Sequence, residues 1–176
     1  MTEDPDNNNQ AATPVLTVIG KSKSGKTTLL EKLIKELSGR GYRLATVKRH
    51  AHPGFEIDVP GKDSWRFAQA GSQQVIIASP DKFAAYRKLD QELSLDEIVA
   101  GIKGADLILA EGYKQANKPS LEVLRAANSA ELIGSPEQRI ALVSDLRLEV
   151  GVPHFEFDDI QGIVGLIEKH FLLSRK

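Results

Sequence analysis

Short apolar runs alternate with amphipathic stretches along most of the chain. The first run, residues 15–19, is rich in β-branched side chains and ends at Gly20, which is typical of a strand buried on both faces of a parallel sheet. Leucine and isoleucine then recur at helical spacing over residues 29–37, with charged residues on the other face. Glycines at positions 39 and 41 predict where this helix ends.

The same alternation continues towards the C-terminus. Two of the later apolar runs end in an acidic residue, Glu111 and Asp145. Apolar strands that alternate with helices predict an α/β fold, with a doubly wound, mostly parallel sheet flanked by helices. The further strands are expected at 44–47, 74–78, 82–86, 106–110, 121–124 and 140–143, and the further helices at 63–70, from 94 onward and within 159–172.

The length predicts one domain over residues 14–176, preceded by a polar, disordered leader over residues 1–13. The leader has neither the basic nor the apolar region of a secretory signal, and no apolar run is long enough to cross a bilayer. The absence of cysteine excludes thiol catalysis and Cys-ligated zinc. A formal net charge of −1 argues against nucleic acid as a partner. We therefore expect a cytoplasmic protein that binds neither nucleic acid nor membranes.

The strongest chemical signal is the phosphate-binding loop, or P-loop, at residues 20–27. The segment reads Gly-Lys-Ser-Lys-Ser-Gly-Lys-Thr, which matches the P-loop pattern in full, and it joins a predicted strand to a predicted helix as the motif requires. Its glycines allow backbone N–H groups to converge on phosphate oxygens, and the helix start adds positive potential. The nucleotide-binding residues predicted from the motif are Gly20, Lys21, Ser22, Ser24, Gly25, Lys26, Thr27 and Thr28.

A P-loop also assigns roles to single side chains. The Lys26 ammonium would reach the β- and γ-phosphates, and the Thr27 hydroxyl would bind Mg²⁺. An acid at the end of a neighbouring strand should hold the metal or its water. Glu111 is the favoured residue because Gly112 leaves room for a phosphate, and Asp145 is its rival.

A basic loop follows the second predicted strand, at the edge of the sheet where ligands usually bind. Lys48 opens this loop, which is either an anion-binding or switch loop or a solvated surface loop. Asp58 lies farther along it, where an acid could order the metal-bound water or the attacking water. Residues 117–120 lack the aspartate of the guanine-reading motif, so the pattern leaves ATP and GTP open.

Several segments together resemble the MobB family of molybdopterin-guanine dinucleotide biosynthesis adaptor proteins. The resemblance extends over nearly the whole chain from Val15 to the C-terminal helix, and its combination of motifs is much more specific than the P-loop alone. The matching segments are residues 20–30 (GKSKSGKTTLL), 46–52 (TVKRHAH), 58–64 (DVPGKDS), 70–71 (AG), 106–114 (DLILAEGYK) and 157–162 (FDDIQG).

The resemblance implies a homodimer that binds GTP with Mg²⁺ and hydrolyses it slowly at most. It implies contact with a MobA-like molybdenum cofactor guanylyltransferase, the enzyme that joins GMP to molybdopterin. Asp63 and Glu111 fall in its signature segments and would face the nucleotide. The alternatives are a small-molecule kinase that uses ATP or GTP, which its scattered arginines disfavour, and a binding module that nucleotide occupancy switches.

Overall fold

The computed structural model describes residues 12–50, 52 and 54–173. These residues group into two compact units, the sheet unit (Met1–Arg49 and Leu95–Lys176) and the hairpin unit (His50–Ser94). A single domain over residues 14–176 stays a prediction. The expected leader falls, apart from its last two residues, outside the described part of the chain.

The sheet unit contains six parallel strands in the order β2-β5-β1-β6-β7-β8. The parallel arrangement confirms the predicted fold class. The last strand was not expected, because two residues are too few to show an alternating pattern. The strands are β1 (Val15–Ile19), β2 (Leu44–Lys48), β5 (Leu107–Glu111), β6 (Ser120–Leu124), β7 (Arg139–Ser144) and β8 (His154–Phe155).

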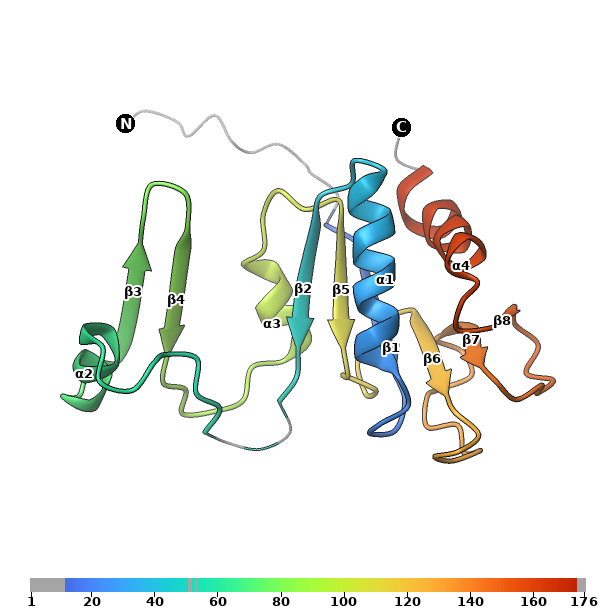
Figure 1. Ribbon diagram of the computed structural model, residues 1–176, viewed down its shortest axis with the longest axis horizontal. Helices are drawn as coiled ribbons and strands as arrows, with labels where there is room; N and C mark the ends of the chain where they lie inside the picture. The colour runs from blue at the N-terminus through green and yellow to red at the C-terminus, as the bar shows by residue number, and fades with distance from the viewer. Residues whose placement is uncertain (1–11, 51, 53, 174–176) are drawn as a thin grey trace. The chain divides into compact units, whose positions relative to one another are not determined.

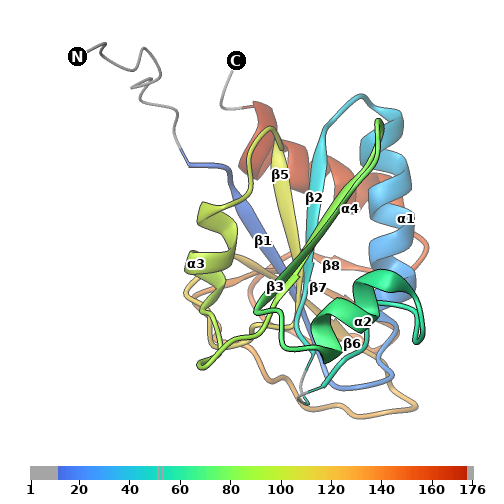
Figure 2. The ribbon, with the colours of Figure 1, turned by 90° about the vertical axis from the view of Figure 1, so that its left-hand side faces the viewer.

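Helices cover both faces of this sheet, which explains why its central strands are continuously apolar (Figure 2). On one face, α1 (Lys26–Gly39) and α4 (Ile160–Ile167) bury residues such as Leu33 and Ile163. On the other face, α3 (Leu95–Ala100) buries Leu95 against β1 and β5. The C-terminal helix ends in a π-helical turn, η1 (Glu168–Leu172), which buries Phe171 and Leu172. Each such apolar side chain stabilises the fold by about 1.5–3 kcal/mol.

All the long strands of the sheet point the same way, so their carboxyl ends meet at one edge (Figure 1). The loops that follow β1, β2, β5, β6 and β7 all leave from this edge. In doubly wound sheets the ligand site lies at this edge, where neighbouring loops leave in opposite directions.

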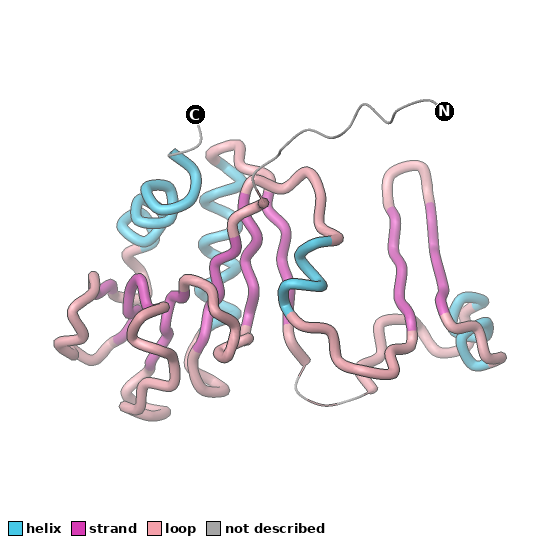
Figure 3. Tube along the Cα trace, turned by 180° about the vertical axis from the view of Figure 1, so that it is seen from behind, coloured by secondary structure: helices cyan, strands magenta, loops and turns pink. Residues whose placement is uncertain are grey.

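The hairpin unit contains α2 (Asp63–Gln69), β3 (Gln74–Ala78) and β4 (Phe83–Arg87). The two strands pair antiparallel in a sheet of their own, and α2 lies against β3 (Figure 3). Lys62 occupies the N-cap position of α2 and Asp63 is the first helical residue, where its negative charge favours the helix dipole.

Candidate nucleotide-binding site

The P-loop backbone turns sharply between β1 and α1. Gly20 has φ 148° and Gly25 has φ 92°, values that side chains rarely allow. A Cβ atom on Gly20 would lie 2.2 Å from the carbonyl oxygen of Val123. The first glycine of the motif is therefore required because the loop passes directly against β6.

Lys26 is the first residue of α1, and its side chain folds back over the loop. Its Nζ donates to the carbonyl oxygens of Gly20 (2.9 Å) and Lys21 (2.7 Å). An ammonium has three protons, so one remains for a phosphate oxygen. Burial lowers the pKa of Lys26; the Glu111 carboxylate raises it in part, and the charge of Lys48 lowers it further.

The phosphate hollow is a cavity of about 430 Å³ beside this loop. At its far side the Lys48 ammonium lies 3.5 Å from the Glu111 carboxylate, whose side chain is 18% exposed. Three lysines against one carboxylate create positive potential for a polyanion. The lining residues are Ser22, Lys23, Gly25, Lys26, Thr27, Thr28, Lys48 and Glu111.

Two oxygen donors in the phosphate hollow fit a magnesium ion, the Thr27 hydroxyl and the Glu111 carboxylate. Among the described residues, no group of three or more His, Asp or Glu side chains is placed to hold a metal. Magnesium usually keeps several waters and shares its coordination with substrate phosphates. The predicted metal ligands therefore suit an ion that arrives with the nucleotide.

The loop after β6 supports the P-loop from outside. Asn128 Nδ2 donates to the carbonyl oxygen of Ser22 (2.6 Å), and Lys21 forms an ion pair with Glu131. Lys21 was predicted to bind nucleotide, but it is not among the residues that line the phosphate hollow. Ser24 is buried, and its Oγ has no hydrogen-bond partner within the part of the chain that the structure describes.

A buried ion pair anchors this supporting loop, and sequence reasoning missed it. Glu122 is 1% exposed and Arg139 is 7% exposed. Arg139 Nε donates to one Glu122 carboxylate oxygen (2.7 Å), and the backbone N–H of Gly134 donates to the other (3.0 Å). The only signal in the sequence was a charged residue inside the apolar run of β6.

Asp145, the rival of Glu111, lies at a second cavity of about 410 Å³, the carboxylate cavity. Its Oδ1 accepts a hydrogen bond from the backbone N–H of Ala126 (2.7 Å). Glu111, and not Asp145, lines the phosphate hollow. The carboxylate cavity is lined by Gly25, Thr28, Leu29, Lys32, Arg125, Asp145, Glu156, Phe157 and Asp158.

Asp58 and Asp63 both lie in the hairpin unit. Asp58 accepts hydrogen bonds from the Tyr86 hydroxyl (2.9 Å) and its neighbour's backbone N–H (2.8 Å). A hydrogen bond with Ser64 contributes most to lowering the pKa of Asp58. Asp63 lies 3.7 Å from Arg66 in an exposed ion pair. Both acids therefore have polar partners within the hairpin unit, and their roles towards the nucleotide stay predictions.

A central strand that runs through a complete P-loop into a helix, in a parallel sheet covered on both faces, defines a P-loop protein of the nucleoside-triphosphatase fold. The sequence matches the profile of the family described as molybdopterin guanine dinucleotide synthesis protein B, MobB, over residues 15–145. The chain belongs to the MobB family, which confirms the resemblance.

Named relatives agree with this assignment. The chain is 37% identical to the molybdopterin-guanine dinucleotide biosynthesis adapter protein of Haemophilus influenzae, over 92% of this chain and 90% of that protein. It is 33% identical to the adapter protein of the same name from Escherichia coli, over 88% and 91% of the two chains.

Solved structures show the same fold. The crystal structure of a molybdopterin-guanine biosynthesis protein B superposes with a TM-score of 0.68 at 32% identity, over 88% of this chain and 98% of that one. The structure of Bacillus subtilis MobB superposes with a TM-score of 0.71 at 23% identity, over 87% and 97%. Within the described residues, no helix is both long and apolar enough to cross a membrane.

Proposed function

We propose that this chain binds GTP with Mg²⁺ in the phosphate hollow and acts as an adapter for a MobA-like guanylyltransferase that joins GMP to molybdopterin. The observation that best supports this proposal is the phosphate hollow, which three lysines line beside a complete P-loop in a chain of the MobB family. GTP hydrolysis would be slow at most, so binding rather than turnover would be the working step.

Different residues of the phosphate hollow would contact different parts of a magnesium-bound triphosphate. The P-loop backbone and the start of α1 supply N–H groups to the phosphate oxygens. Lys26 supplies a cation already positioned by two carbonyl oxygens. Lys48 adds charge from the end of β2, and Thr27 and Glu111 would orient the metal and its water. The magnesium ion would neutralise part of the phosphate charge.

The proposal includes a homodimer in the cytoplasm. Support for self-association comes from the hairpin unit, where several large apolar side chains are exposed, which is typical of an interaction surface. These side chains are Phe55, Ile57, Val59, Phe67, Ile76, Ile77 and Phe83. Sedimentation equilibrium of the purified chain should give twice the monomer mass, and a monomer at micromolar concentration would contradict this part of the proposal.

The main test combines binding with reconstitution. Calorimetric titration with GTP, with and without Mg²⁺, should show binding that the metal strengthens. The purified guanylyltransferase, given molybdopterin and Mg·GTP, should then form more dinucleotide when this chain is added, and the Lys26→Ala variant should give no such increase. Equal product with and without the chain would reject the adapter role, and wild-type GTP affinity in the variant would reject the site.

A further inference from the structure

We infer that the carboxylate cavity is the base site of the nucleotide and that Asp145 selects guanine. This inference rests on the proposed function, because it assigns the base end of the ligand whose phosphates occupy the phosphate hollow. The two cavities share Gly25 and Thr28 in their linings. A single nucleoside triphosphate can therefore extend from one into the other around the start of α1.

The charges of the two cavities differ in the way a nucleotide requires. Three lysines and one carboxylate line the phosphate hollow, whereas three carboxylates, one lysine and one arginine line the carboxylate cavity. A phosphate group would be repelled there. A neutral heterocycle with N–H donors would be accepted.

An aromatic platform borders the same cavity. The Arg125 guanidinium lies 4.1 Å from the centre of the Phe157 ring, and both residues are half-buried. A Cβ atom placed on Gly25 would lie 3.3 Å from Arg125 Nη2 and 3.3 Å from Phe157 Cε1. The platform therefore packs directly onto the P-loop. Planar bases stack on aromatic rings and guanidinium groups.

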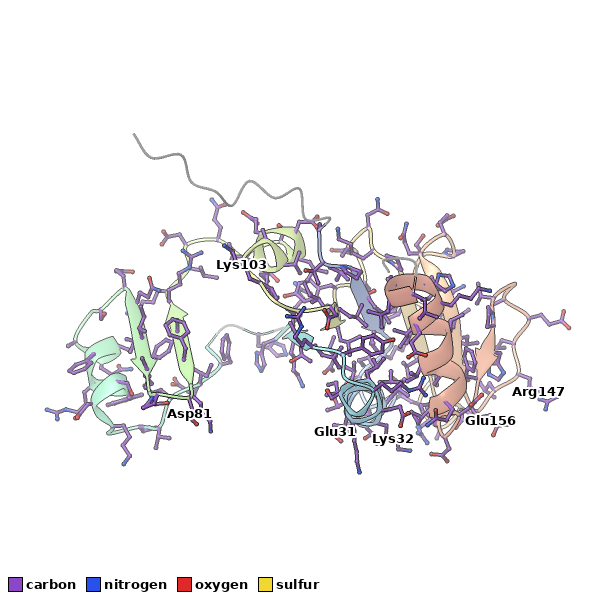
Figure 4. The ribbon with its side chains drawn as sticks, turned by 90° about the horizontal axis from the view of Figure 1, so that it is seen from above. Glu31, Lys32, Asp81, Lys103, Arg147 and Glu156 are labelled. Atoms are coloured by element: carbon purple, nitrogen blue, oxygen red, sulfur yellow. The ribbon has the colours of Figure 1, made fainter. Side chains whose placement is uncertain are left out.

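Asp145 is the carboxylate best placed to read the edge of the base. Its Oδ1 is oriented by the backbone N–H of Ala126, and Oδ2 has no hydrogen-bond partner among the residues that the structure describes. Asp158, by contrast, is paired with Lys32 at 2.6 Å. Lys32 and Glu156 lie on the same side of the sheet unit (Figure 4), and within the described part of the chain no hydrogen bond orients the Glu156 side chain.

The chemistry of a carboxylate favours guanine over adenine. An ionised carboxylate only accepts hydrogen bonds and can accept two in parallel. Guanine presents two adjacent donors, N1–H and the N2 amino group, which match it. Adenine presents an acceptor, N1, beside its amino group, and this nitrogen would face the carboxylate without a proton between them.

The test uses Asp145→Asn, in which the amide oxygen can still accept from Ala126 while one acceptor becomes a donor. Glu31→Gln is the control, because it removes an exposed carboxylate of α1 that lines neither cavity. Four ligands with Mg²⁺ separate the two ends of the site: GTP, ATP, xanthosine triphosphate and inorganic tripolyphosphate. Xanthine has a carbonyl oxygen where guanine has its N2 amino group, so it suits the Asn amide.

Wild-type protein should bind GTP at least about tenfold more tightly than ATP, the factor expected for a charge-assisted hydrogen bond. Asp145→Asn should lower GTP affinity by about tenfold or more, raise affinity for xanthosine triphosphate and leave tripolyphosphate binding unchanged. Glu31→Gln should change each affinity by less than about threefold.

Unchanged GTP affinity in Asp145→Asn, or equal GTP and ATP affinity in the wild type, would overturn the base assignment and leave the phosphate site intact. A wild-type protein that binds neither GTP nor tripolyphosphate would instead overturn the proposed function, and this inference with it.

Discussion

The phosphate hollow and the carboxylate cavity share Gly25 of the P-loop and Thr28 of α1, yet their lining side chains carry net charge of opposite sign. The first is formed largely by consecutive residues of one loop, with additions from the ends of β2 and β5. The second takes Arg125, Asp145 and Phe157 from the segments that follow three different strands, β6, β7 and β8. A short motif thus forms the polyanion site, while the neighbouring loops determine what else can bind.

The largest effect is expected for Glu122→Gln, which would disturb both cavities at once. The variant leaves the Arg139 charge buried without its partner and weakens the anchor of the loop that carries Asn128 and Arg125. Breaking a buried pair in this way costs about 3–5 kcal/mol of unfolding free energy. Urea denaturation measures this loss of unfolding free energy.

The control Glu137→Gln changes an exposed carboxylate of the same loop, and we expect it to lower the unfolding free energy by less than about 0.5 kcal/mol. A loss below about 1 kcal/mol for Glu122→Gln would show that the pair does not anchor the loop.

Lys26→Ala should affect only the phosphate hollow. Because the variant removes the cation held at the centre of the loop, affinity for Mg·GTP and for tripolyphosphate should both fall by about 100-fold, as for a charge-assisted contact. The control is Lys23→Ala, which removes an exposed lysine from the same lining and should cost a few-fold at most. Equal losses in the two variants would mean that total charge, and not the position of Lys26, binds the triphosphate.

Thr27→Ala separates the metal from the phosphates. If the Thr27 hydroxyl binds Mg²⁺, the variant should lose about tenfold in GTP affinity when the metal is present and little in EDTA. Calorimetry in the two buffers measures the difference, with Thr27→Ser as the control that keeps the hydroxyl. An equal loss in EDTA would remove Thr27 from the metal site.

The lowered pKa of Lys26 predicts an alkaline limit to phosphate binding. Anionic phosphates favour the ammonium form, so above the lowered pKa of the free protein each binding event must take up a proton. Tripolyphosphate affinity should therefore fall as pH rises, beginning below the usual lysine pKa of 10.5. Tripolyphosphate is the right ligand because guanine itself loses a proton in alkaline solution. Affinity that stays constant up to pH 10.5 would contradict a lowered pKa.

The smallest effect is expected for Lys21→Ala. The ion pair of Lys21 with Glu131 lies at the surface, with side chains 39% and 70% exposed, and such pairs contribute about 0.2–1 kcal/mol. Unfolding free energy should change within that range and GTP affinity within about threefold, as in the partner variant Glu131→Gln. A loss of hydrolysis in Lys21→Ala alone would instead show that this lysine reaches the nucleotide.

Local patterns predicted most of the fold and named most of the residues that line the phosphate hollow. The strand, P-loop and helix over residues 15–39 follow from apolar periodicity and glycine spacing, both of which act between near neighbours. The pairing of β3 with β4 in a sheet of their own depends on contacts that no periodicity encodes. Glu111 was favoured over Asp145 because a strand end and a following glycine are visible in the sequence; it lines the phosphate hollow, and its role towards the metal stays a prediction.

In the carboxylate cavity, Asp145 had a local signal because it ends an apolar run, but the residues that surround it in the fold did not follow from the sequence. The stacking of Arg125 on Phe157 joins residues that only the fold brings together. Lys23 lines the phosphate hollow but was not predicted to bind nucleotide, although it lies within the P-loop motif. The burial of Glu122 depends on Arg139 and on backbone N–H groups of the following loop, and a lone charged residue in an apolar run does not reveal such partners.

The position of β1 has a consequence for how the chain assembles during synthesis. Thr17 of β1 donates to Pro119, 102 residues later, and both edges of β1 pair only with β5 and β6. When the ribosome has released the P-loop and α1, neither neighbour of β1 yet exists. Contacts this distant in sequence form slowly and leave apolar strand edges open to aggregation. The segment that contains the P-loop is thus translated before both strands that complete its pairing, and until then the edges of β1 stay unpaired.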